Sequence, residues 1–134
     1  MDINELSSKV IKAAINVHKE LGPGLLESVY QACMDIELRD MGLGVSTEVP
    51  VPIRFRGKEL TGQNLRLDLL VENILVVELK SVNQVSDIHK KQLLTYLKLS
   101  QKPLGLLINF NEVLLKDGET FEKLTGFPIL QISA

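Results

Sequence analysis

The stretch LRLDLLVENILVVELK, residues 65–80, decides the fold of this chain. It contains two apolar runs, 65–71 and 74–79, and the polar pair Glu72-Asn73 between them has the composition of a turn. Short aliphatic runs separated in this way are typical of a β-hairpin. We therefore predict two adjacent strands in the middle of a sheet.

Three charged residues of this hairpin can meet on one patch of the sheet. Asp68 lies in the first strand, and Glu78 and Lys80 lie in the second. Side chains alternate between the two faces of a strand, so Glu78 and Lys80 share a face while Leu79 points into the core. A carboxylate in apolar surroundings must be hydrated, paired or bound to a cation. Because oxygen ligands suit a hard divalent metal such as Mg²⁺, the sequence predicts a metal site here.

Length and composition favour one folded domain. The chain has 134 residues, of which 45% are hydrophobic, and we predict a single domain over residues 1–134. Its net charge of −2 provides no overall attraction to nucleic acid, so binding of that kind would need a local basic patch. The single cysteine, Cys33, excludes a disulfide within the chain and a cysteine-ligated zinc or iron–sulfur site.

The sequence carries no signal for a membrane. No apolar run approaches the ~20 residues of a transmembrane helix. The first residues, Met-Asp-Ile-Asn-Glu, lack the basic start and the apolar stretch of a signal peptide. We therefore expect a soluble, cytoplasmic protein.

Two helices are predicted before the hairpin. Apolar residues at steps of three and four indicate a helix over residues 3–21, and the Gly-Pro-Gly sequence at 22–24 ends it. A second helix runs from about residue 25 to residue 41, where Gly42 closes it. We expect its buried stripe to consist of Leu25, Val29, Ala32, Cys33 and Ile36.

After the second helix the pattern changes to strand-like runs, with one further helix. The helix covers about residues 87–99, with Ile88 and Leu93 among its apolar positions, and the strands outside the hairpin cover 45–51, 53–55, about 59–61 and 104–110. The strand at 104–110 is almost wholly apolar, as burial on both faces requires, and the helix before it predicts a parallel crossover from strand 74–79. In the tail, residues 119–124 alternate like a strand but also suit a helical turn, and residues 128–132 are a candidate last strand. The order predicts an α/β fold, a mixed central β-sheet flanked by helices.

Polar residues on two of these helices can join the hairpin site. Glu27 and Tyr30 are three residues apart on the second helix, and Gln92 and Tyr96 are four apart on the crossover helix, so each pair shares a helix face. The crossover helix follows the second hairpin strand after a short loop, so its first turns can return over the end of that strand.

The chemistry suggested by this convergence is metal-assisted hydrolysis of a phosphodiester. Asp68, Glu78 and Glu27 offer negative charge to one or two Mg²⁺ ions, and a bound metal orients and acidifies a water molecule. Lys80 can position that water, stabilise the phosphate, or act as a base if its pKa is depressed.

Three motifs in this chain resemble those of a known family. Residues 24–30, with Gly24, Glu27 and Tyr30, match the signature of the GxxExxY proteins. Asp68 followed by residues 78–80 resembles the core of the PD-(D/E)XK nuclease superfamily, and residues 92–96 resemble the QxxxY element of its RecB-like branch. The likeness extends from about residue 15 to residue 117.

The resemblance implies a restriction-endonuclease-like core with two N-terminal helices and Mg²⁺- or Mn²⁺-dependent cleavage of DNA. It implies that Asp68 and Glu78 ligate the metal, that Lys80 is catalytic, and that Glu27 is a further acidic ligand. Gln92 and Tyr96 would support the site or contact DNA. Leu67 stands where the superfamily's name has a proline, although that proline is often absent.

Further residues are candidates for contact with nucleic acid, namely Tyr30, Arg66, Lys90 and Lys91. Arg66 belongs to a cluster on the predicted strands that could form a track for a phosphate backbone, together with Arg54, Arg56 and Lys58. Alternating surface charge on a hairpin would produce the same pattern.

Ordinary structural roles are the alternative for each motif. Glu27 near a helix start would favour the helix dipole, Tyr30 and Tyr96 could be core residues, and Gln92 could be a solvated helix residue. His18, near the apolar stripe of the first helix, is better explained as packed than as a ligand. The alternative function is therefore a non-catalytic module that retains the fold, either a homodimeric scaffold or a DNA-binding subunit of a larger complex.

Overall fold

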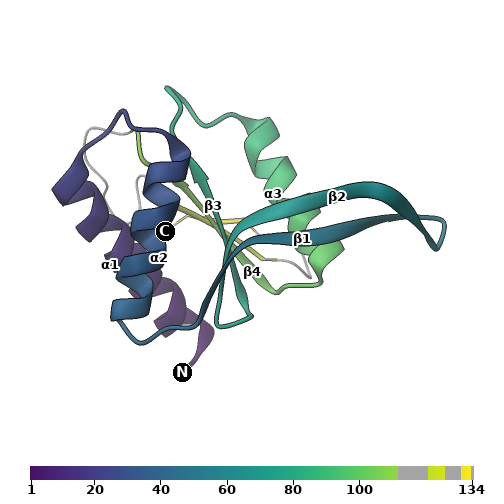
Figure 1. Ribbon diagram of the computed structural model, residues 1–134, viewed down its shortest axis with the longest axis horizontal. Helices are drawn as coiled ribbons and strands as arrows, with labels where there is room; N and C mark the ends of the chain where they lie inside the picture. The colour runs from purple at the N-terminus through teal and green to yellow at the C-terminus, as the bar shows by residue number, and fades with distance from the viewer. Residues whose placement is uncertain (112–120, 126–130, 134) are drawn as a thin grey trace.

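The computed structural model describes residues 1–111, 121–125 and 131–133, which form a mixed sheet with three helices (Figure 1). The strands lie in the order β1-β2-β3-β4-β5-β6, and β3 and β4 are parallel while the other neighbouring pairs are antiparallel. The elements are α1 (Ile3–Leu21), α2 (Glu27–Asp40), β1 (Val45–Phe55), β2 (Lys58–Val71), β3 (Leu75–Lys80), α3 (Asp87–Ser100), β4 (Leu104–Asn109), β5 (Phe121–Thr125) and β6 (Gln131–Ser133). The predicted mixed α/β fold is confirmed.

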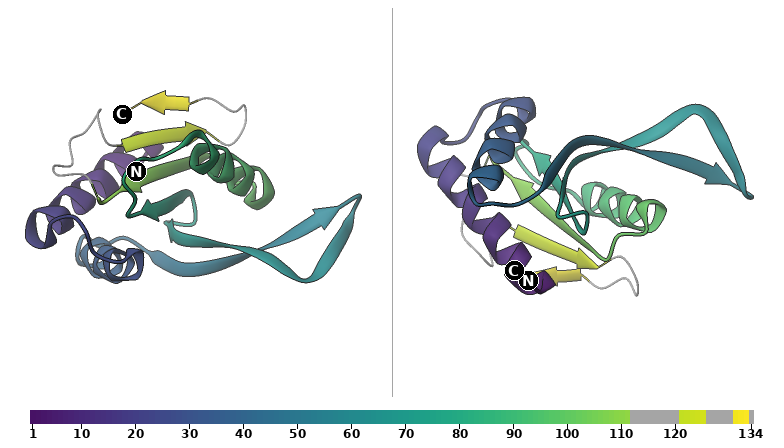
Figure 2. Two further views of the ribbon diagram at one scale, coloured as in Figure 1. Left: turned by 90° about the horizontal axis from the view of Figure 1, so that it is seen from above. Right: turned by 60° about the horizontal axis from the view of Figure 1, so that its bottom comes forward.

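The helices cover opposite faces of the sheet and make two apolar cores. One core contains the buried side chains of α1 and α2, and the other contains Leu93 and Leu97 of α3. Figure 2 shows α1 and α2 together on one side of the strands and α3 on the other. Every residue of β4 is buried, as its apolar sequence predicts, and the parallel β3–α3–β4 crossover is also confirmed.

The N-terminal helix has the predicted boundaries. Asp2 caps its start by accepting the backbone N–H of Glu5 at 2.8 Å. Gly22 ends it with φ of 72°, a left-handed conformation that costs glycine little. His18 is buried, and its ring lies 6.4 Å from that of Phe110, so the expectation that it is packed is confirmed.

Helix α2 buries a different stripe from the predicted one. Tyr30, Met34 and Leu38, at steps of four, are fully buried, whereas Ile36 is 62% exposed and Val29 is also exposed. The predicted stripe was wrong because α2 packs through one narrow row of large side chains. On α3, Ile88, one of the apolar positions of the predicted helix, is likewise exposed.

Strands β1 and β2 are longer than predicted and form a projecting hairpin. Their pairing runs from Val45↔Val71 to Pro52↔Asn64, shifts register, and continues to the two-residue turn Arg56-Gly57. Residues 52–66, which we call the arm, extend past α3 and away from α1 and α2 (Figures 1 and 2). The short separate strands expected here are therefore one continuous ribbon.

The C-terminal strands lie near the predicted positions. β5 overlaps the alternating run at 119–124, which resolves the strand-or-helix alternative for residues 121–124, and β6 overlaps the candidate strand at 128–132. The other residues of those two runs lie outside the described part. Within the described residues, no helix has the length and apolar character needed to cross a bilayer.

Candidate active site

The ladder between β2 and β3 opens where the acidic residues lie. Regular pairing ends at Leu69↔Val77, and beyond it side chains take over as partners of the backbone. The N–H of Asp68 donates to Oε1 of Glu78 at 3.2 Å, and the N–H of Leu79 donates to Oδ2 of Asp68 at 2.8 Å. Each carboxylate thus accepts a hydrogen bond from the other strand, which holds the two acids side by side.

Burial and mutual repulsion perturb both acids. Burial raises the pKa of Glu78 to about 8, and the charge of Asp68 adds to that rise. Burial also raises the pKa of Asp68, and the charges of Glu27 and Glu48 act in the same direction. The positive charge of Lys80 lowers the pKa of both carboxyl groups, so the lysine lies within electrostatic reach of the pair. The end of β3 therefore carries an acidic site in which one lysine only partly offsets the charge of two carboxyl groups.

The crossover helix brings Tyr96 to the same place. Burial raises the pKa of the Tyr96 hydroxyl, and the charges of Glu78 and Asp68 raise it further. An electrostatic effect of this kind requires proximity, so Tyr96 belongs to the neighbourhood of the acidic pair. Gln92 lies one turn earlier on the same helix, with an exposed side chain.

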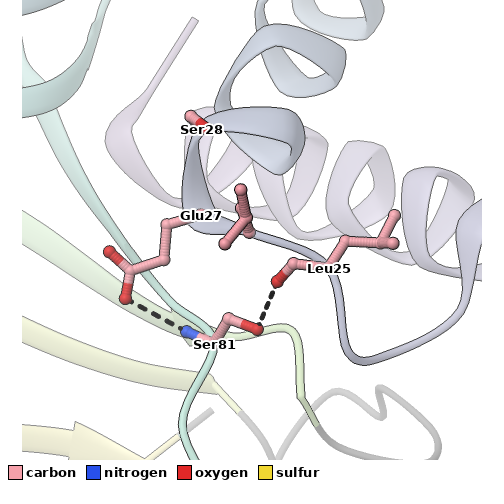
Figure 3. A pocket seen from close by; sticks show the side chains of 5 residues that line it. Leu25, Glu27, Ser28 and Ser81 are labelled. Carbon is pink, nitrogen blue, oxygen red and sulfur yellow. Dashed lines mark hydrogen bonds between the residues drawn. The ribbon is translucent and has the colours of Figure 1, made fainter.

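Glu27 enters from the opposite side of the sheet, at the start of α2. Its Oε1 accepts the N–H of Ser81 at 3.3 Å, and the Ser81 hydroxyl donates to the carbonyl of Leu25 at 2.7 Å (Figure 3). These two bonds join the residue after Lys80 to the loop before α2. The junction lines an open cavity of about 390 Å³, together with Leu26 and Ser28.

Tyr30 holds this loop in place. Its hydroxyl donates to the carbonyl of Gly22 at 2.6 Å and accepts the N–H of Leu25 at 3.2 Å, while its ring stacks on Phe110 at 4.3 Å. Gly24 adopts φ of 90° within the loop, a conformation that favours glycine. Because its side chain is fully buried, Tyr30 has no surface to offer DNA, and the expected contact with nucleic acid is corrected to a structural role.

Comparison with known proteins identifies the family of the chain. A family model described as the PD-(D/E)XK nuclease superfamily matches residues 4–121. The chain belongs to this superfamily. No curated protein and no solved structure gives a significant match. Asp68 and the triplet Glu78-Leu79-Lys80 are the residues of this PD-(D/E)XK domain that lie where its β2–β3 ladder opens.

Two residues of the candidate site were not singled out from the sequence, and the first is Glu48. It lies in β1 between residues paired with Leu67 and Leu69, hence opposite Asp68, and its φ of 50° marks a local irregularity of the strand. Its carboxylate accepts Gln31 Nε2 at 3.3 Å and contributes to the raised pKa of Asp68. Pairing the first strand with the second in register would have revealed it.

The second is Ser81, which shapes the loop after Lys80 together with Asn109. Asn109 is buried, and its amide donates to the carbonyl of Val82 at 2.9 Å and accepts the N–H of Val82 at 3.1 Å. This buried amide on β4 fixes the chain between β3 and α3.

The remaining candidates lie around this centre. Arg66 is exposed on β2 two residues before Asp68, and Lys90 and Lys91 lie in the first turns of α3, half-buried and exposed respectively. Within residues 1–111, 121–125 and 131–133, no three acidic, histidine or cysteine side chains are arranged to hold a metal ion together. The acidic residues that lie side by side are therefore Asp68 and Glu78, while the carboxylate of Glu27 is hydrogen-bonded to Ser81.

Proposed function

We propose that this protein is a Mg²⁺-dependent deoxyribonuclease that hydrolyses phosphodiester bonds, with selectivity for DNA structure or ends. The observation that carries the proposal is the pairing of Asp68 with Glu78 across the opened ladder, with Lys80 beside them. Membership of a nuclease superfamily supports the same chemistry. The three motifs further support a place among the GxxExxY proteins and in the RecB-like branch.

The acidic pair suits a hard divalent cation. Asp68 and Glu78 would hold the cation through their carboxylate oxygens, the ligand atoms that Mg²⁺ prefers. A cation there would offset the repulsion and burial that raise both pKa values. Glu27 would join as a further ligand if its bond to Ser81 exchanged for the metal.

The chemistry that Mg²⁺ supplies when bound is the acidification of a water molecule and the neutralisation of charge on the phosphate. Lys80 shares the strand of Glu78, and its ammonium group would hold the attacked phosphate or the water. Tyr96 and Gln92, from α3, would orient the substrate or the acidic pair.

Cleavage of labelled DNA tests the proposal. Wild-type protein should cut in Mg²⁺ or Mn²⁺ and not in EDTA, while Asp68→Asn and Lys80→Ala should each lose at least about a hundredfold in rate. Asp68→Asn keeps an oxygen that can accept the Leu79 N–H, so its fold should survive and thermal melting will check this. Equal cleavage by wild type and both variants would identify a contaminant and defeat the proposal.

A second candidate is a non-catalytic module, either a homodimeric scaffold or a DNA-binding subunit. One observation favours it: the two carboxylates already satisfy backbone N–H groups and so have a structural use without any metal. This candidate predicts no effect of Mg²⁺ on the melting temperature that depends on Asp68 or Glu78.

A further inference from the structure

The arm carries a charge opposite to that of the rest of the chain. It contains four cations and one anion, a net charge of +3, in a chain whose net charge is −2, so the residues outside the arm sum to −5. The cations are Arg54, Arg56, Lys58 and Arg66, and the anion is Glu59. Segregation of this kind makes a local attraction for a polyanion that the overall charge conceals.

The arm also lacks a core of its own. Every residue from 54 to 64 is exposed, including Phe55 at 63% and Leu60 at 41%. A two-stranded ribbon that buries so little is marginal in water, so its own burial does not account for the length of the hairpin. Arg56 lies over the Phe55 ring with its guanidinium carbon 5.0 Å from the centroid, which presents a cation at the tip.

The edge of the arm is poorly suited to pairing with another strand. β1 is the edge strand of the sheet, and Pro50 and Pro52 remove two N–H groups from it. A row of cations further opposes the approach of a second copy of the same arm. These features favour an anionic partner over β-strand addition.

The dimensions of the arm fit duplex DNA. β2 carries extra residues at the register shift, so β1 sets the length of the ribbon: from Phe55 at the tip to Glu48, opposite Asp68, it advances about 23 Å at roughly 3.3 Å per residue. This is roughly two thirds of the ~34 Å turn of B-form DNA. The major groove admits a two-stranded ribbon. Arg66 lies two residues from Asp68 on the same strand, so the basic track leads directly into the acidic pair.

We propose that the arm is a DNA-binding element that holds the phosphate backbone of a duplex over roughly two thirds of a helical turn from the acidic pair. The proposal deepens the proposed nuclease function by assigning the path of the substrate, and it rests on that function. The arm supplies the affinity for DNA that a protein with a net charge of −2 otherwise lacks. The opened β2–β3 ladder supplies the reaction site.

The test measures DNA binding without cleavage. Fluorescence anisotropy with a labelled duplex of about two turns, roughly 20 base pairs, is recorded in EDTA at several salt concentrations. The arm variant combines Arg56→Asn, Lys58→Gln and Arg66→Gln. Asparagine at position 56 tolerates the φ of 51° in the turn, so the hairpin should be kept.

A matched control removes the same charge from a helix outside the arm. It combines Lys9→Gln, Lys12→Gln and Lys19→Gln, all exposed on α1. The arm variant should bind about tenfold or more weakly than wild type, and its slope of log K against log salt should fall by about 0.9 for each phosphate that it no longer neutralises. The control should retain the wild-type slope, and both variants should melt within a few degrees of wild type.

Each outcome decides the proposal. Equal affinities and slopes for the arm variant and the control, or no binding by wild-type protein at low salt, would overturn it. If the arm variant instead changes the mass in analytical ultracentrifugation while DNA affinity stays constant, the arm contacts another protein chain and the proposal is wrong. Binding that depends on the arm without any metal-dependent cleavage would remove the nuclease function and keep the arm as a DNA-binding element.

Discussion

The two ends of β2 differ in burial and in charge. At its C-terminal end, Leu69 and Val71 are fully buried and Asp68 faces Glu78 across an opened ladder. At its N-terminal end, residues 58–64 are exposed on both faces and belong to an arm whose net charge is +3. One strand thus joins a buried acidic centre to an exposed basic extension, so substitutions can change stability at one end and contact with substrate at the other.

The largest effect on the free energy of unfolding should come from truncating a buried side chain at the C-terminal end of β2. Leu69→Ala is expected to lower the free energy of unfolding by about 2–5 kcal/mol, because a fully buried side chain leaves a cavity. Leu60→Ala, at 41% exposure on the arm, should change it by less than about 0.5 kcal/mol. Urea denaturation measures both. Comparable losses for the two variants would contradict the contrast between the two ends.

Divalent metal should stabilise the acidic end alone. At a concentration about 100 times its Kd, Mg²⁺ is expected to add roughly 2.7 kcal/mol to the free energy of unfolding. Thermal melting measures the shift, which should vanish in Asp68→Asn and persist in the arm variant. A shift of the same size in Asp68→Asn would place the metal elsewhere.

Without metal, stability should fall as pH rises through the range set by Glu78. Its pKa is 4.5 for the ordinary group and about 8 in the fold, so between these values the folded state holds a proton that the unfolded chain releases. Rising pH then favours unfolding, by up to about 1.4 kcal/mol for each pH unit, and the loss is complete above pH 8. The raised pKa of Asp68 acts with the same sign.

Denaturant titrations at several pH values in EDTA check this slope. Glu78→Gln should flatten most of it, because the neutral amide has no proton to release. If stability instead rises with pH over the same range, the prediction is wrong and another titrating group dominates the pH dependence.

The smallest effect should come from the loop beside the acidic end. Tyr30→Phe keeps the ring stacked on Phe110 and removes two hydrogen bonds, to Gly22 and Leu25, so it should cost about 1–2 kcal/mol in stability. Because the same loop carries Glu27, metal-dependent cleavage should also weaken. Thermal melting and the Mg²⁺ dependence of cleavage measure the two effects, and unchanged metal dependence would limit Tyr30 to packing.

Much of the site was accessible to sequence reasoning because its central part is local. Asp68, Glu78 and Lys80 lie on adjacent strands of one hairpin, and strand periodicity with a short turn is enough to bring them together. The motif at residues 24–30 marked Glu27 and Tyr30 without revealing their contacts. The ring of Tyr30 stacks on Phe110, which is far away in the chain, so no local pattern could predict this contact.

The sequence by itself determined the boundaries of α1, the parallel crossover and the acidic hairpin, since each follows from periodicity or from neighbours along the chain. Only the tertiary structure decided which row of α2 is buried, that Glu48 faces Asp68, and that Asn109 fixes the loop after Lys80. It also decided that β1 and β2 run on as an uncovered arm. These features depend on which surfaces meet when distant segments pack, and burial is a property of that assembly rather than of any short stretch of residues.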